Sequence, residues 1–501
     1  MALADYYARN ALAAAQVLAG FDEQRIREVL GKERVGLCIG TDAAESSEGR
    51  TLIDLLVRLL ARLYPTLTIR SDIGGRTAGE EVRNLALRIN PAIEFSSDPT
   101  VEVAVGTELP VAGDWPLIFV GSNDWNAFVA TAGPRAVGSS DNPFGAGAAA
   151  CLAAANLFRW IFLREGPLLD KDLTFSLLQS ASPRTATPTL AGSVGEIVLV
   201  GAGAIGNATA WAFSRLPMEG VLRIVDHEVI DLGNLQRYAL TEREDEGRNK
   251  VDIVARHFNG KVRAKTHPVK FEDFVASEGY SWARMMLALD SSRDRRAAQA
   301  SLPQWIANAW TQPGDLGVSS HDFLNGACVA CLYLPDHGLE NEDAIIASAL
   351  GVPNELMRIR MLLHNGQGVP RELLDVISTA RNIPIERLLP FEGRAVRHLY
   401  AEGFCGGAVI PLGELGIPRQ EVHVPLAHQS ALSGLLLAAA AVREALGLNG
   451  LGTQVTRLDV MRTLGSDLRQ SAAKDSRGIC ICQDADYRDV YRRKYASALE
   501  G

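Results

Sequence analysis

A glycine-rich loop between an apolar run and a helix-forming stretch constrains the fold of this chain more than any other feature. The loop, Gly201-Ala-Gly203-Ala-Ile-Gly206, directly follows the apolar residues 197–200. Glycines in such a strand-loop-helix unit let the backbone approach a phosphate at the N-terminus of the helix. Asp226 lies 20 residues after Gly206, at the end of the next apolar run, where a carboxylate can bind a ribose hydroxyl. The pattern predicts a nucleotide-binding α/β domain. Taken alone it favours a nicotinamide or flavin enzyme, with a tight turn that binds no ligand as the alternative.

The composition is that of an ordinary globular protein. A chain of 501 residues is too long for one compact core, so we expect two or three domains. The 50 basic and 59 acidic residues give a formal net charge of −9, which offers no broad attraction for nucleic acid or anionic lipid. We therefore expect a protein or small-molecule partner, and neither nucleic acid nor a membrane.

The sequence also bears on the cellular compartment. The N-terminus, Met-Ala-Leu-Ala-Asp, does not resemble a signal peptide. The apolar stretch 435–442 is far shorter than the roughly 20 residues needed to cross a bilayer. We expect a cytoplasmic protein, in which the seven cysteines indicate thiol chemistry or metal binding rather than a disulfide framework.

Apolar runs alternate with amphipathic stretches in two successive series. The first series has strand-like runs and helical stretches at 35–39, 52–63, 67–69, 80–89, 101–105, 117–120 and about 145–163. A linker rich in small residues is predicted at 180–195, and the rhythm restarts with strands at 197–200 and 221–225. This rhythm predicts two related, mainly parallel sheets with crossover helices. We match the run 117–124 of the first half with the run 286–293 of the second.

The two halves differ in their capacity to bind a nucleotide. The first strand of the first half runs into Gly40-Thr-Asp-Ala-Ala-Glu-Ser-Ser-Glu48. Three carboxylates there would repel a phosphate, and the glycine loop is missing. Only the second half is predicted to hold a nucleotide.

The strand rhythm stops between residues 335 and 403, where helical patterns at 353–363 and 371–380 predict a helical insertion. A strand-like run at 422–424 and an apolar helix at 431–446 then return to the nucleotide domain, followed by a short charged tail. The predicted domains are 1–190, 191–335, the insertion 336–409, and 410–501.

The residues after Asp226 change the functional prediction. The stretch Asp226-His-Glu-Val-Ile-Asp-Leu-Gly-Asn234-Leu-Gln-Arg237 resembles the signature of the ubiquitin-activating enzyme superfamily, which includes ThiF and MoeB. Gly247-Arg-Asn-Lys250 and Leu289-Asp290 resemble the next two motifs of that family, in the same order. A dehydrogenase has no need of these elements. The resemblance implies two ThiF-type adenylation domains, the first of them inactive, with a helical insertion in the second that carries a catalytic cysteine.

The resemblance also implies roles for single residues. Asp226 would hold the ribose of ATP, Asn234, Arg237 and Lys250 would contact its phosphates, and Asp290 would bind Mg²⁺. Adenylation brings a carboxylate to an α-phosphate, so cations and metal must neutralise the growing charge. The alternative for Arg237 and Lys250 is a solvated charged face. The family often takes a further arginine from a partner or paired domain. Arg9 is the nearest candidate, and the alternative is that it is a surface arginine.

Two cysteine pairs resemble the zinc site of MoeB-like members. Cys328 and Cys331 form the first pair, and Cys480 and Cys482 the second. Four thiolates would make a closed structural zinc site. The second pair has one intervening residue where the family usually has two, and buried free thiols are the alternative.

Cys405, in Gly403-Phe-Cys-Gly-Gly407, follows the helical insertion. Activating enzymes that form a thioester carry a cysteine near an inserted domain, so the resemblance implies that Cys405 captures the activated carboxylate. The alternative is a small buried residue at a tight turn. Cys38 and Cys151 lie on apolar stretches and are predicted to be core residues.

Four functions compete at this stage. The first is a ubiquitin-activating enzyme of bacterial type, with a ubiquitin-like protein and a conjugating enzyme as partners and with a homodimer as one option for its assembly. The second is a ThiF- or MoeB-like adenylator of a sulfur-carrier protein, in which Cys405 is structural. The third is an NAD- or FAD-dependent oxidoreductase. The fourth is a scaffold without turnover, which the intact motifs of the second half disfavour.

Overall fold

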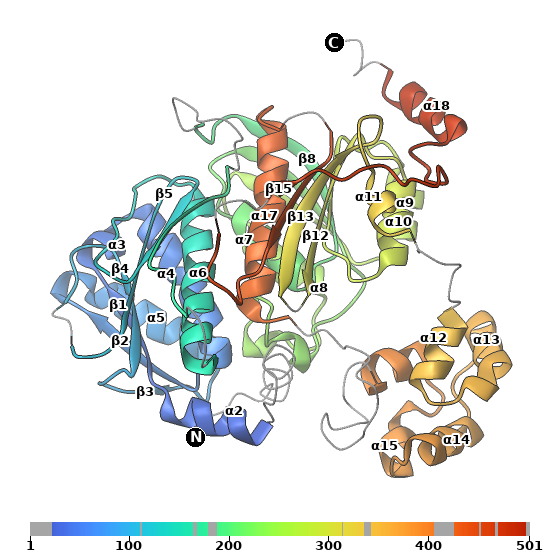
Figure 1. Ribbon diagram of the computed structural model, residues 1–501, viewed down its shortest axis with the longest axis horizontal. Helices are drawn as coiled ribbons and strands as arrows, with labels where there is room; N and C mark the ends of the chain where they lie inside the picture. Colours follow the sequence, from blue (N-terminus) through green and yellow to red (C-terminus); the bar gives the residue numbers. More distant parts are fainter. Residues whose placement is uncertain are drawn as a thin grey trace. The chain divides into compact units, whose positions relative to one another are not determined.

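The computed structural model describes residues 23–110, 113–163, 168–178, 188–312, 314–334, 342–404, 425–449, 452–465 and 469–496 (Figure 1). The chain divides into two compact units. One comprises Met1–Leu334 and Pro425–Gly501, and the other comprises Pro335–Val424. The larger unit contains two sheets, which define a first and a second Rossmann-like domain.

The sheet of the first domain has seven strands in the order β3-β2-β1-β4-β5-β6-β7. Neighbouring strands from β3 to β5 pair in parallel, whereas β6 and β7 pair antiparallel. Every residue of β1 and β4 is buried, as expected for central strands covered on both faces. The strands are β1 (Val35–Ile39), β2 (Thr66–Ser71), β3 (Glu94–Phe95), β4 (Val101–Val105), β5 (Leu117–Asn123), β6 (Asn126–Ala130) and β7 (Asp172–Ser176).

Five described helices belong to the first domain: α2 (Glu23–Lys32), α3 (Thr41–Glu45), α4 (Ser47–Leu63), α5 (Arg76–Ile89) and α6 (Pro143–Phe162). The helix α6 begins with a proline in its first turn and is capped by Asn142, whose side chain accepts from the backbone N–H of Phe144 at 3.0 Å. Its length and composition would suffice to cross a membrane, but 89% of its apolar window is buried inside the fold. Within this structure α6 is therefore a core helix.

The sheet of the second domain repeats the same strand order. Its eight strands follow the order β10-β9-β8-β11-β12-β13-β14-β15, parallel from β10 to β12 and antiparallel beyond. The prediction of two related Rossmann-like domains is thus confirmed. The strands are β8 (Ser193–Val200), β9 (Glu219–Val225), β10 (Val262–His267), β11 (Arg284–Leu287), β12 (Trp305–Gln312), β13 (Asp315–Asp322), β14 (Gln454–Leu458) and β15 (Arg469–Gln470).

Two details of the sequence prediction were wrong. The run 117–124 contains the fifth parallel strand of its sheet, β5, whereas the run 286–293 begins in the fourth, β11, so β11 corresponds to β4 instead. Both runs are apolar and end in small polar residues, so composition alone did not distinguish their sheet positions. The predicted linker also extended too far, because β8 begins at Ser193.

The helices of the second domain are α7 (Ala204–Phe213), α8 (Lys250–Ala255), α9 (Phe271–Glu278), α10 (Ser292–Ala300), α11 (Val329–Leu332), α17 (Ala427–Ala445) and α18 (Ala485–Lys494). Figure 1 shows α6 and α17 between the two sheets, where they pack against each other. The contact is close at Gly147 of α6, where an added Cβ would lie 2.9 Å from side-chain atoms of Leu435 and Trp211. Gly434 likewise brings α17 near to α7, since an added Cβ would lie 2.4 Å from the carbonyl oxygen of Ile205.

The smaller unit is helical, as predicted for the insertion. Its helices are α12 (Glu342–Ala349), α13 (Leu356–Asn365), α14 (Arg371–Arg381), α15 (Ile385–Leu388) and α16 (Val396–His398), with single turns at Pro353–Glu355, Leu389–Phe391 and Leu399–Phe404. It has a core of its own, which includes Ile359, Leu373 and Ile377. The run 422–424 lies outside the described residues.

Candidate active site

Three neighbouring strands of the second domain end in one row, and several of the predicted site residues lie in the loops that follow it. Val200 at the end of β8 is in register with Val225 of β9 and with Leu287 of β11. Gly201, Asp226 and the loop that carries Asp290 therefore emerge at the same edge of the sheet. The carboxyl edge of a parallel sheet is where open α/β folds bind ligands.

The glycine loop has the geometry that requires glycine. Gly201 adopts φ +96°, a left-handed conformation that side chains disfavour. A Cβ on Gly206 would lie 1.9 Å from the carbonyl oxygen of Gly201, so any side chain there would push α7 away from the loop. Gly203 begins α7 as its N-cap without a side-chain capping bond, so the loop presents bare backbone at a helix N-terminus.

The side chain of Asp226 links the glycine loop to the residues that follow β9. Its Oδ2 accepts from the backbone N–H of Ala202 at 2.7 Å, and its Oδ1 accepts from the backbone N–H of Glu228 at 2.9 Å. The side chain is half-buried. The predicted ribose ligand therefore lies beside the loop, held in one orientation by two backbone donors.

Lys250 is brought to this edge by a short pairing of backbone segments. Residues 228–230 bond to residues 247–250, with Lys250 N donating to Glu228 O at 3.0 Å and Ile230 N donating to Arg248 O at 2.8 Å. Lys250 is the first residue of α8, as predicted. Its Nζ donates to the carboxylate of Glu228, and its side chain is almost fully buried.

The surroundings of Lys250 keep it charged. Burial by itself would lower the pKa of its ammonium group, but Tyr238, Glu228 and Asp226 together raise that pKa well above its usual value. The Nζ atom lies 5.3 Å from the ring centroid of Tyr238, within reach of a cation–π contact. Lys250 is therefore a fixed positive charge next to the glycine loop, not the solvated lysine of the alternative.

Asn234 and Arg237 lie in the irregular segment between β9 and α8. The amide oxygen of Asn234 accepts from Asp231 N at 3.1 Å, and Asp231 Oδ1 accepts from Gly233 N at 2.8 Å, so the two side chains close a short turn. The guanidinium of Arg237 donates to Gly233 O at 3.3 Å and to Gln236 Oε1 at 3.4 Å. The turn thus fixes both residues, and a phosphate contact by either stays a prediction.

Asp290 follows β11 by three residues and is exposed. Its neighbour Leu289 is held by Arg295, whose Nε donates to Leu289 O at 3.0 Å. An exposed carboxylate beside the glycine loop is chemically suited to Mg²⁺, which takes one or two carboxylates and completes its shell with water and phosphate oxygens.

The corresponding edge of the first domain is occupied by its own carboxylate. Asp42 accepts from Thr107 N at 2.9 Å, from Thr107 Oγ1 at 2.8 Å and from Glu108 N at 3.2 Å, in the loop after β4. Partial burial would raise the pKa of Asp42, but these hydrogen bonds hold it below its usual value. A carboxylate held charged at this edge would repel a phosphate.

The four paired cysteines come together, although the two pairs are far apart in sequence. Their Sγ atoms all lie within 4.8 Å of one another, with Cys328 and Cys480 3.4 Å apart and Cys331 and Cys482 3.5 Å apart. Four thiolates around zinc at about 2.3 Å stand roughly 3.8 Å apart, so the donor set and its spacing fit a tetrahedral ion. The single residue between Cys480 and Cys482 does not prevent this, because a turn closed by Gln483 N and Cys480 O folds the pair.

The structure describes two of the remaining three cysteines. Cys38 and Cys151 are buried in the first domain, as predicted. Burial raises the pKa of the Cys38 thiol to about 12, assisted by Glu102, and burial also raises the pKa of Cys151 well above its usual value. Neither is a nucleophile in this fold. Cys405 and Arg9 lie outside the described residues, and their predicted roles stay predictions.

Sequence reasoning missed two residues of this site and its support from the first domain. Glu228 pairs with Lys250, and Tyr238 packs with its hydroxyl 3.5 Å from the ideal Cβ position of Gly203. Both stand inside or beside the motif 226–237, but their contacts arise only when residues 228–230 pair with 247–250. Arg58 and Arg62 of α4 contact the segment 235–241 from the first domain, and no local pattern marks them.

Two family models match the chain. The ThiF family model matches residues 189–292, and the model of prokaryotic E2 family C matches residues 38–163. These ranges fall within the second and the first domain, respectively.

Similar proteins were found among curated sequences and solved structures. Uncharacterized protein y4jF of Sinorhizobium fredii (strain NBRC 101917 / NGR234) is 39% identical over 513 residues, covering 100% of this chain and 98% of the relative. The Nedd8-activating enzyme E1 catalytic subunit of Drosophila melanogaster is 31% identical over 104 residues, which is 20% of this chain and 23% of that subunit. The crystal structure of E. coli MccB with MccA-N7isoASN is 13% identical with a TM-score of 0.35, covering 57% of this chain and 66% of that one.

Proposed function

Because this chain belongs to the E1-like ThiF/MoeB superfamily, we propose that it uses ATP to convert the C-terminal carboxylate of a ubiquitin-like protein into an acyl-adenylate. The observation that carries the proposal is the meeting of four elements at one sheet edge. These are the glycine loop, Asp226, the buried ammonium of Lys250, and Asp290.

Adenylation of a carboxylate requires this combination of groups. One carboxylate oxygen attacks the α-phosphorus, the bond from that phosphorus to the bridging oxygen breaks, and pyrophosphate leaves with its electron pair. Charge grows on the phosphates during this step, so fixed cations stabilise the transition state. Lys250 supplies such a cation, Arg237 supplies a second within the same segment, and Asp290 would hold Mg²⁺, which neutralises phosphate charge when bound.

The second step of the proposal is capture of the acyl group on Cys405. The thiolate sulfur attacks the acyl carbon, a thioester forms, and AMP leaves. The product would pass to a separate conjugating enzyme. The first domain matches a family named for prokaryotic E2 proteins, but its two described cysteines, Cys38 and Cys151, are buried with raised pKa values. We therefore assign the acceptor thiol to Cys405 and not to the first domain.

Two further parts of the proposal concern metal and location. The four-cysteine cluster would hold a structural zinc ion that ties the tail with α18 to the second domain. The location of the enzyme would be cytoplasmic, where paired cysteines serve metal binding rather than disulfides. The runner-up is adenylation of a sulfur-carrier protein without thioester formation, for which the same adenylation residues would serve.

The test is ATP binding and pyrophosphate exchange by the full chain. Wild type should bind ATP with Mg²⁺, and should exchange pyrophosphate into ATP when given a ubiquitin-like partner protein. Asp290→Ala should lose exchange while its melting temperature is unchanged, because the side chain is exposed. Asp273→Ala, an exposed aspartate on α9, is the matched control and should keep exchange. Tight NAD binding without ATP binding would refute the proposal.

A further inference from the structure

An arginine of the first domain reaches the nucleotide segment of the second domain. Arg62 lies in the last turn of α4, and its side chain is almost fully buried. Its Nη1 donates to Leu235 O at 2.5 Å, and its Nη2 donates to Ala239 O at 3.1 Å and to Thr241 O at 2.6 Å. One guanidinium thus binds three carbonyl groups of the other domain.

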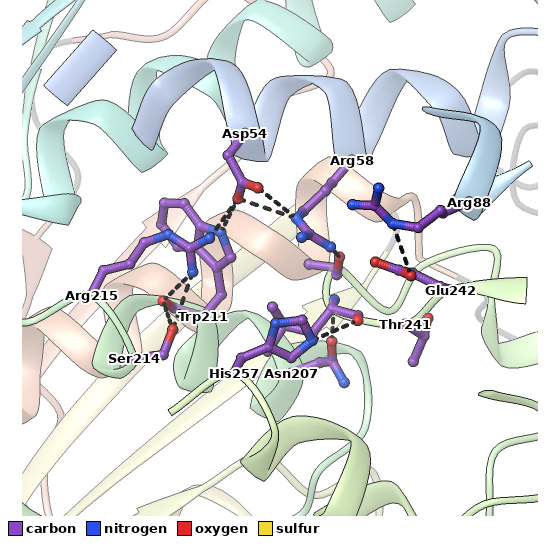
Figure 2. Close-up of polar contacts among 12 residues, drawn as sticks. Asp54, Arg58, Arg88, Asn207, Trp211, Ser214, Arg215, Thr241, Glu242 and His257 are labelled. Atoms are coloured by element: carbon purple, nitrogen blue, oxygen red, sulfur yellow. Dashed lines mark hydrogen bonds and ion pairs between the residues drawn. The ribbon is translucent and has the colours of Figure 1, made fainter. Parts of the chain in front are cut away.

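A second arginine, one turn earlier on α4, reinforces this contact. Arg58 donates to Ala239 O at 3.3 Å through Nη1 and to Asp54 through Nε at 3.1 Å. Asp54 in turn accepts from Trp211 Nε1 at 2.8 Å and from Arg215 Nη2 at 2.7 Å. Figure 2 shows this network, in which α4 runs above the second domain and Asp54 and Arg58 point down into it.

The segment that receives these bonds carries Arg237, a proposed phosphate ligand, and Tyr238, which packs against Lys250. Arg237 and Tyr238 lie between Leu235 and Ala239, two of the three acceptors of Arg62. Residues 235–242 contain no described helix or strand, so their carbonyl groups lack the partners that regular structure would provide. Buried carbonyl groups must be paired, and the guanidinium of Arg62 pairs three of them.

From the other side, the same segment is held by the glycine-loop helix. Asn207 of α7 accepts from Leu240 N at 2.6 Å through Oδ1, and the side chain of Thr241 donates to Tyr238 O at 2.8 Å. Tyr238 then lies between Gly203 and Lys250. A shift of the 235–241 backbone would therefore move Tyr238 and Arg237 relative to the glycine loop.

We propose that Arg62, assisted by Arg58, is a positioning residue for nucleotide binding in the second domain. The inference rests on the proposed ATP-dependent function. Because α4 fixes the loop that aligns Arg237 and Tyr238, the first domain has a role in catalysis without a nucleotide site of its own. Sub-ångström placement of such groups strongly affects rates, since electrostatic stabilisation depends on preorganised geometry.

The test compares two buried arginines that bridge the domains. Arg62→Met keeps the length and apolar stem of the side chain but removes the three hydrogen bonds. Arg443→Met is the matched control, because Arg443 of α17 is equally buried and donates across the boundary to Leu177 O at 2.7 Å, outside the segment 235–241. Arg62→Lys retains a charge with fewer correctly placed donors and should restore part of the lost affinity.

ATP with Mg²⁺ is the probe, measured by titration calorimetry on full-length protein, with melting temperatures recorded in parallel. Arg62→Met should weaken ATP binding at least tenfold, and hydrogen exchange at residues 235–241 should accelerate. Arg443→Met should change ATP affinity less than twofold, whatever its melting temperature. Arg58→Met should lose less ATP affinity than Arg62→Met. It replaces Arg62→Met in the test if the Arg62 variant does not fold.

Unchanged ATP affinity in folded Arg62→Met, or in folded Arg58→Met if Arg62→Met does not fold, would overturn the inference while leaving the proposed function in place. If Arg62→Met and Arg443→Met lose ATP affinity equally, Arg62 is only a general interface residue, and this result would also overturn the inference. If wild type does not bind ATP, the proposed function itself fails, and the inference with it.

Discussion

Arg159 and Arg443 make reciprocal hydrogen bonds across the boundary between the two domains. Arg159, in the last turn of α6, donates to Val460 O at 2.6 Å and to Arg462 O at 3.1 Å, just after β14. Arg443, in the last turn of α17, donates to Leu177 O at 2.7 Å, just after β7. The helices α6 and α17 occupy equivalent places in their domains, so each domain gives the other the same contact. The two domains form an intramolecular pair.

This pairing predicts that Arg159 contributes strongly to stability. Its guanidinium also forms a buried ion pair with Asp170 at 2.6 Å, so Arg159→Met would leave a buried carboxylate without its cation. Such losses typically cost about 3–5 kcal/mol. Urea unfolding should show a drop of that order in the free energy of unfolding. Arg462→Ala, at a side chain 86% exposed, should change it by less than about 0.5 kcal/mol. Equal effects of the two changes would contradict the assignment.

The ion pair between Lys250 and Glu228 predicts opposite effects of changing its two members. Lys250→Met should abolish detectable ATP binding, because it removes the fixed cation beside the glycine loop. Glu228→Gln should tighten ATP binding several-fold: although partial desolvation opposes it, Lys250 holds the pKa of that carboxylate below its usual value, and the negative charge repels phosphate. Glu246→Gln, at an exposed glutamate paired with Arg243, is the control. Weaker binding by Glu228→Gln would show that the carboxylate itself binds the ligand.

The cysteine cluster predicts about one zinc ion per chain. Elemental analysis of protein purified without added metal should find it, and X-ray absorption should show four sulfur ligands at about 2.3 Å. Cys482→Ser should lose the metal and lower the melting temperature, because the cluster joins the turn before α18 to α11. Cys151→Ala alters a buried thiol of the first domain and should keep the metal. Well-folded wild type without zinc would refute the site.

Replacing Cys405 distinguishes thioester formation from adenylation of a sulfur-carrier protein. With ATP, Mg²⁺ and the ubiquitin-like protein, wild type should form a covalent adduct on denaturing gels that disappears with reductant. Cys405→Ala should lose the adduct and keep pyrophosphate exchange, because adenylation uses other residues. An adduct that persists in Cys405→Ala would assign the acceptor to another cysteine. Active exchange without any adduct in wild type would favour the sulfur-carrier function.

His257 predicts a loss of stability in mild acid. Burial, together with repulsion by Arg58, Arg256 and Arg215, lowers its pKa from an ordinary value of 6.5 to about 4. Between these pH values the unfolded chain binds a proton that the folded chain does not, so stability falls as pH falls from about 6.5 toward 4. The loss from this residue is about 2 kcal/mol at pH 5.

Thermal melts between pH 7.5 and 5 measure this effect. His257→Gln should make the melting temperature depend less on pH than in wild type. His321 and His428 account for part of the remaining pH dependence, because burial lowers their pKa values to about 4 and about 3. An unchanged slope in His257→Gln would mean that His257 takes up its proton equally in the folded and the unfolded chain, and would contradict the prediction.

The sequence by itself determined the features that depend on neighbours in the chain. The loop from Gly201 to Gly206 could be predicted because its turn needs bare backbone within six residues, and Lys250 at the start of α8 because the motif and the helix are contiguous. The repeated strand rhythm likewise predicted two parallel sheets, since each buried strand must be apolar by itself. The equivalence of β11 with β4 was missed, because the position of a strand in a sheet depends on pairing and not on its own composition.

Only the tertiary structure decided which distant groups meet. Arg62 binds the carbonyl groups of Leu235, Ala239 and Thr241 across more than 170 residues of chain, and Cys328 meets Cys480 across 152 residues. Lys250 meets Glu228 because two short backbone segments pair. Backbone carbonyl groups occur at every residue, so no pattern of letters marks the ones that an arginine will satisfy. That choice is made when the two domains bury their shared surface and each polar group enclosed there must find a partner.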